Sequence, residues 1–211
     1  MKHGNLFRAS LLRAWAALAV GLAFCLFCGA ALAATPAETL IAGNIQVGTG
    51  ILDNKQLTAE ERKTQFESFL LDVTDVRRIA LFTLGPYAQS VSAADRDGFV
   101  AAFQDYAVAV YRSYFTKYDG QRLTVVRSYE HAPGDFIVVT QMTAPGHQNV
   151  PPIEVDFRVL GDGGKLRVVD CAVAGIWLAL AERDDFRAVL AQSKGDVAGL
   201  AARLHSAAQQ Y

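Results

Sequence analysis

Cysteine is scarce in this chain, which excludes a disulfide framework. Two of the three cysteines, Cys25 and Cys28, lie in an apolar N-terminal segment, so only Cys171 belongs to the rest of the sequence. A single thiol cannot form an intramolecular disulfide, even in an oxidising compartment. Because Cys171 lies in an apolar run with no histidine nearby, we interpret it as a small buried hydrophobic residue. The fold must therefore depend on packing alone.

Clusters of basic residues and catalytic motifs are also lacking. No run of Lys and Arg occurs, so nucleic acid is not an expected partner. Outside the N-terminal segment the histidines are His131, His147 and His205, and no two of them have metal-ligand spacing. The sequence Gly161-Asp162-Gly163-Gly164-Lys165 lacks the first glycine and the final Ser or Thr of a phosphate loop, and no G-x-S-x-G motif is present. We therefore expect no catalytic residue, metal or cofactor.

The N-terminus has the pattern of a secretory signal peptide. Lys2, Arg8 and Arg13 precede an apolar run over 14–30, and Ala31-Leu32-Ala33 provides the small residues that a signal peptidase requires. We expect cleavage after Ala33, which leaves a single domain over 34–211. The apolar run is shorter than the roughly 20 residues of a membrane-spanning helix, although an uncleaved N-terminal anchor remains an alternative. Removal of the three basic residues changes the net charge from −1 to −4.

The remaining sequence predicts an α+β domain. Residues 36–118 are helical in pattern, residues 121–173 form short β-rich runs, and residues 178–209 are helical again. Thr58 and Glu61 have capping-box spacing, and Ser92 is a second helix start. The turn residues predict four antiparallel strands in meander order and two closing helices. The predicted strands cover about 122–130, 135–143, 152–160 and 165–172, and the predicted closing helices about 178–192 and 196–209.

Strand alternation predicts a sheet with one buried and one wet face. Ile153, Val155, Phe157 and Val159 alternate with charged residues. Asp170 shares its alternation face with Leu166 and Val168, where an unpaired charge is costly. We expect a structural role for Asp170, in which its carboxylate accepts N–H groups of the turn 173–175 or pairs with a basic residue. A catalytic carboxylate is the alternative.

Three blocks of the sequence together resemble the MlaC family, also called the toluene-tolerance family. Each block is weak alone, but they occur in the family's order and span nearly the whole of 34–211. The first block runs from Phe69 to Ala80 and on to Leu84-Gly85-Pro86-Tyr87; the second covers 99–121 with Phe103, Tyr111, Tyr118 and Gly120; the third covers 165–175, followed by Arg183, Phe186, Leu190 and Gly195.

The resemblance implies a periplasmic lipid carrier, without enzymatic activity. Such a carrier shuttles phospholipid, or a hopanoid in one sub-branch. The lipid moves between an outer-membrane lipoprotein complex and an inner-membrane ABC transporter with an MCE-domain protein. The carrier contacts these complexes only transiently. The resemblance also implies that the N-terminal helices and the two C-terminal helices pack on one face of the four-stranded sheet and enclose an apolar lipid cavity. The family usually has Ser where this chain has Trp177, so we expect a reshaped lipid site.

On this hypothesis the lipid tails contact apolar residues of the long helix, the turn at Gly85-Pro86 and the sheet. The expected lipid-binding residues are Phe82, Tyr87, Phe103, Tyr106, Val139, Val155, Phe157 and Trp177. We expect hinge points at Gly85, Gly175 and Gly195. Two alternatives remain: an NTF2-like enzyme or binding protein that uses a carboxylate such as Asp170 on a small hydrophobic molecule, and an interaction module with a filled core.

Overall fold

The computed structural model describes residues 34–115, 117–146 and 150–211, without the side chains of residues 114, 115 and 162. Residues 34–211 form one compact unit. The predicted signal segment and His147 lie outside the described residues. Within these ranges no helix is both long and apolar enough to cross a membrane.

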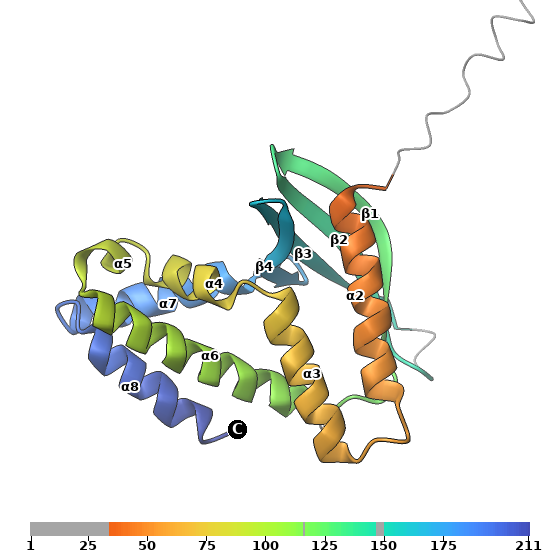
Figure 1. Cartoon of the computed structure of the whole chain (residues 1–211), viewed down its shortest axis with the longest axis horizontal. Helices are drawn as coiled ribbons and strands as arrows, with labels where there is room; N and C mark the ends of the chain where they lie inside the picture. Colours follow the sequence, from red (N-terminus) through yellow and green to blue (C-terminus); the bar gives the residue numbers. More distant parts are fainter. Residues whose placement is uncertain (1–33, 116, 147–149) are drawn as a thin grey trace, which may run out of the picture. The chain divides into compact units, whose positions relative to one another are not determined.

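Within the described ranges, five helices precede the sheet and two follow it (Figure 1). They are α2 (Pro36–Asp53), α3 (Ala59–Val73), α4 (Val76–Leu84), α5 (Tyr87–Ser90), α6 (Ala93–Phe115), α7 (Leu178–Gln192) and α8 (Val197–Ala208). The expected caps are confirmed. Thr58 and Glu61 form a reciprocal capping box at the start of α3, and the Ser92 hydroxyl accepts the backbone N–H of Asp95 at 3.1 Å.

The sheet is antiparallel, with strands in sequence order. The strands are β1 (Arg122–Ala132), β2 (Asp135–Thr143), β3 (Ile153–Asp162), β4 (Lys165–Val173) and β5 (Ile176–Trp177). The α+β class and the meander are confirmed. The expected number of strands was wrong by one, because the chain turns back after Val173 and adds a two-residue strand to the edge of β4. Gly175 has a φ of 81° in this turn, a value that favours glycine.

Two separate clusters of buried residues stabilise the domain. The larger cluster lies among α4, α6, α7 and α8. In it the ring of Phe186 packs edge to face against Phe99 and against Phe103, at centroid distances of 6.0 and 6.4 Å. The smaller cluster lies between α2 and the sheet, with Ala37 and Ile41 against Val138 and Val159. Figure 1 shows α2 across the sheet and α6 beside α8. The helices therefore contact the sheet at two places, through α2 and through α4 and α7 beside β4.

We predict that Phe99→Ala lowers the free energy of unfolding by about 3–5 kcal/mol, because it removes a fully buried ring from the centre of the helical cluster. Leu180→Ala is the control: this side chain on α7 is 46% exposed, and its truncation should change stability by less than about 0.5 kcal/mol. Urea denaturation followed by circular dichroism measures both. Equal losses for the two variants would contradict this description of the core.

Candidate lipid-binding site

The sheet has an apolar face, which contacts α2, and an opposite face where Asp156, Arg158 and Asp170 lie beside buried apolar residues such as Val139 and Ala172; we call this the polar face because of its charges. In an antiparallel sheet, directly paired residues place their side chains on the same face. Val138, in contact with α2, pairs with Phe157, which pairs with Cys171. Another row on this face joins Thr140, Val155, Val173 and Ile176 across four strands. The α2 face is therefore apolar from β2 to β5.

Exposure along the row from β2 to β5 increases steadily. Thr140 is fully buried and Val155 is 7% exposed, whereas Val173 is 37% and Ile176 62% exposed. The gradient arises because α2 packs on β1 and β2, at the opposite edge of the sheet. We call the part toward β5 the apolar strip. Its residues are Ile153, Val155, Phe157, Cys171, Val173 and Ile176.

Helix α3 connects α2 with the β4 edge of the sheet. Its rings Phe66 and Phe69 lie so close to Gly48 of α2 that a Cβ there would be 3.2–3.3 Å from them. At its C-terminal end, Thr74 forms a bridge with Val168 of β4, and the Asp75 N–H donates to the Val168 carbonyl at 2.9 Å. Helix α3 thus contacts α2 through its rings and β4 through its C-terminal end.

The apolar side chains of α3 are only partly covered. Phe66, Phe69, Leu70 and Val73 follow at helical spacing, yet no residue of this helix is buried. Its polar contacts include an ion pair of Glu67 with Arg112 of α6 and a hydrogen bond from Arg62 to the carbonyl of Leu57 at 3.0 Å. A helix with few buried apolar contacts opens at low cost in free energy.

The structure separates the eight predicted lipid-binding residues into three places. Phe103 is buried in the helical cluster, Tyr87 and Tyr106 pack against it, and Phe82 lies beneath the Arg183 guanidinium at 4.8 Å. These four residues are apart from the sheet because the aromatic face of α6 packs on α8 and α4. Only Val155 and Phe157 belong to the apolar strip.

Val139 and Trp177 lie on the polar face of the sheet. Val139 pairs with Asp156, Asp156 with Ala172, and Ala172 with Trp177. Trp177 is therefore on the side of the sheet opposite the apolar strip. The expectation that Trp177 reshapes the lipid site therefore concerns the face opposite the strip. Sequence alternation along β3 could have identified Ile153 as a strip residue, whereas Val173 and Ile176 depend on the unpredicted strand β5.

A β-bulge changes the expected position of Asp170. Arg158 pairs with Asp170 and Val159 with Val168, so Val169 is the extra residue and Asp170 faces away from Val168. Its carboxylate accepts the N–H groups of Cys171 at 2.8 Å and Ala179 at 2.9 Å, not those of the turn 173–175. Burial raises the pKa of Asp170, whereas the two N–H groups and the nearby Arg158 oppose that shift. Asp170 thus connects β4 with the first turn of α7.

Cys171 is the polarisable member of the apolar strip. Burial, together with the charges of Asp170 and Asp156, raises the pKa of its thiol to about 12. The side chain is neutral at physiological pH, so it contributes an apolar surface and not a nucleophile.

Metal ligands do not gather in the described part of the chain, where no group of three or more His, Cys, Asp or Glu side chains could hold an ion. Two pockets there have volumes of about 130 and 430 Å³, and charged side chains line both. Neither is the enclosed apolar cavity that we expected. The apolar strip, by contrast, is an open surface that charged side chains do not line.

The fold and the strip define an α+β protein with an apolar surface between a sheet edge and a loosely packed helix. The chain matches the MlaC protein family over residues 46–206 and belongs to that family, as the resemblance indicated. A solved structure with a similar fold is the phospholipid-binding protein from Ralstonia solanacearum in complex with a phospholipid. It has a TM-score of 0.66 and 18% identity, over 82% of this chain and 95% of that chain.

We predict that Asp170→Ala destabilises the domain by about 1–3 kcal/mol for each N–H group left without an acceptor. Asp170→Asn is the matched control, because its amide oxygen still accepts both N–H groups, and it should lose less than about 1 kcal/mol. Thermal and urea unfolding of the two variants measure the difference. An Asp170→Ala variant as stable as the wild type would show that this carboxylate has no structural role.

Proposed function

We propose that this protein is a lipid carrier that binds a phospholipid, or a related lipid such as a hopanoid, with the acyl or polycyclic part against the apolar strip. The strip is the observation that carries the proposal: an apolar row whose exposure increases from 7% at Val155 to 62% at Ile176. Membership of the MlaC family and the phospholipid bound to the Ralstonia solanacearum protein support it.

The energetics of lipid tails require such a surface. Two acyl chains of about 16 carbons contain roughly 30 methylene groups, and each costs about 0.8 kcal/mol when exposed to water, which is roughly 25 kcal/mol in total. A carrier must therefore cover nearly all of both tails. The strip provides one wall for this purpose, and the partly covered side chains of α3 provide a second wall.

Movement of α3 admits the tails in this proposal. Its polar contacts at Glu67 and Arg62 are exposed or half-exposed, so their rupture costs little, and its apolar residues gain burial when a lipid replaces water beside them. The bridge from Thr74 to Val168 fixes the C-terminal end of the helix. We infer that the N-terminal part of α3 moves most. The predicted hinges at Gly85 and Gly195 lie in the helical part, away from this movement.

Binding and release, without any bond made or broken, is the proposed activity. Asp170, the carboxylate that an NTF2-like enzyme would use, accepts two backbone N–H groups and lies on the polar face of the sheet. Its geometry supports a structural role. We propose no cofactor; the lipid is cargo.

We further propose that the carrier works in the periplasm after cleavage near Ala33. There it would move lipid between an outer-membrane lipoprotein complex and an inner-membrane MCE-domain ABC transporter. The predicted signal peptide and the family support this location.

Native mass spectrometry tests the proposal. Residues 34–211, expressed in a bacterial host and purified without detergent, should carry a lipid adduct that solvent extraction identifies. In Val173→Asn/Ile176→Asn the affinity should fall at least about tenfold, which is about 1.4 kcal/mol, because two apolar contacts of the tails are lost. These side chains are exposed, so stability should change little.

Val126→Asn is the matched control. Val126 is 52% exposed on β1, at the opposite edge of the sheet, and its replacement should leave the lipid adduct unchanged. A wild-type protein without any adduct, or equal losses in the strip and control variants, would contradict the proposal.

A further inference from the structure

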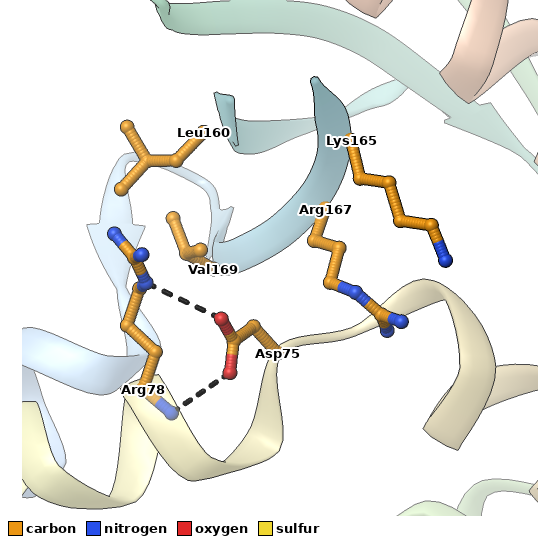
Figure 2. A pocket seen from close by; sticks show the side chains of 6 residues that line it. All are labelled: Asp75, Arg78, Leu160, Lys165, Arg167 and Val169. Atoms are coloured by element: carbon orange, nitrogen blue, oxygen red, sulfur yellow. Dashed lines mark hydrogen bonds and ion pairs between the residues drawn. The ribbon is translucent and has the colours of Figure 1, made fainter. Parts of the chain in front are cut away.

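A small pocket with basic side chains lies at the end of the sheet where β3 turns into β4. Its volume is about 130 Å³, and its lining residues are Asp75, Arg78, Leu160, Lys165, Arg167 and Val169. Leu160 and Val169 supply apolar surface, while the charged groups come from α4 and β4. Figure 2 shows Asp75 between Arg78 and Arg167, and the Arg167 side chain extends toward the segment that joins α3 to α4.

The charges of this pocket are only partly compensated by its own carboxylate. Asp75 accepts the backbone N–H of Arg78 at 3.0 Å and its Nε–H at 3.3 Å, so it is committed to Arg78. Arg167 donates from Nη1 to the neutral carbonyl oxygen of Asp72 at 2.6 Å, which fixes its side chain without neutralising it. Among the described side chains, neither Arg167 nor Lys165 forms an ion pair. Beside the Asp75–Arg78 pair, the pocket therefore has two cationic groups, those of Lys165 and Arg167, without a carboxylate partner among the described side chains.

We propose that this pocket binds a phosphate group, carried either by a soluble phosphate or by the headgroup of a lipid in a membrane. A tetrahedral phosphate accepts hydrogen bonds from donors in several directions, whereas a planar carboxylate is satisfied by one guanidinium. The two donors on β4, the Lys165 ammonium and the anchored Arg167 guanidinium, fit the tetrahedral group better. The volume suits a single small anion, and the apolar walls strengthen its attraction to the cations.

The pocket is distinct from the proposed lipid-tail site. Val159 belongs to the cluster under α2, and the next residue, Leu160, therefore faces the opposite, polar side of the sheet. Arg167 pairs directly with Leu160, so its side chain lies on the polar face too. Along β3, the nearest strip residue to Leu160 is Phe157, three residues or roughly 10 Å away, so the two sites are separated by the face of the sheet and not by distance. On this ground the inference assigns the phosphate to a molecule other than the one whose tails lie on the strip.

Titration of the 34–211 protein with inorganic phosphate at constant ionic strength, followed by amide resonances in NMR, tests the inference. Saturable shifts are expected for the amides of residues 75–78 and 165–169, with chloride giving none.

Lys165→Gln should weaken phosphate binding several-fold, and Lys165→Gln/Arg167→Gln at least tenfold. Among the described residues the Lys165 side chain makes no hydrogen bond, so the single variant keeps the test valid if the double variant unfolds. Lys55→Gln, on the loop between α2 and α3, is the control and should bind like the wild type.

Co-sedimentation with vesicles distinguishes the two sources of phosphate. Binding to phosphatidylglycerol vesicles that is lost in Lys165→Gln would assign the pocket to lipid headgroups. Phosphate shifts without vesicle binding would assign it to a soluble phosphate. No saturable shift, or the same affinity in the wild type and in the Lys165→Gln/Arg167→Gln variant, would overturn the inference, and neither result would affect the lipid adduct that tests the proposed function.

Discussion

Strand β4 connects the helices to the sheet through a few hydrogen bonds, and the position of the apolar strip depends on them. Its Val168 carbonyl accepts the Asp75 N–H at the junction of α3 and α4, and its Arg167 donates to the Asp72 carbonyl. Its Asp170 carboxylate accepts the Ala179 N–H at the start of α7. All three bonds lie at one edge of the sheet, whereas α2 covers the other edge. The apolar surface between them is left partly exposed.

This division accounts for the two clusters of buried residues. The helical cluster is closed and rich in aromatic residues, so it supplies stability without any need of a ligand. The cluster under α2 ends where the strip begins, and α3 beside it has no buried residue. A stable part next to a loosely packed part suits a carrier, because the lipid can enter and leave while the remainder stays folded.

Local signals in the sequence predicted most of the fold. The capping box at Thr58, the start at Ser92 and the alternation around Val155 depend on neighbouring residues, and each was found where expected. The site was harder to predict because it depends on register. The bulge at Val169 reverses the face of Asp170, and the two-residue strand β5 places Ile176 on the strip and Trp177 behind it. Phe103, a predicted lipid-binding residue, is buried in the helical cluster, because apolar periodicity does not reveal which partner covers a helix face.

The central claim is that lipid tails lie against the strip. Photo-crosslinking with a phosphatidylcholine that carries a diazirine in one acyl chain, followed by peptide mapping, tests it most directly. The account predicts labels on residues 153–157 and 171–176 and on α3, with none at Phe103 or on the polar face near Arg158. Labels concentrated among α4, α6 and α8 would show that the tails enter the helical cluster and would contradict the account.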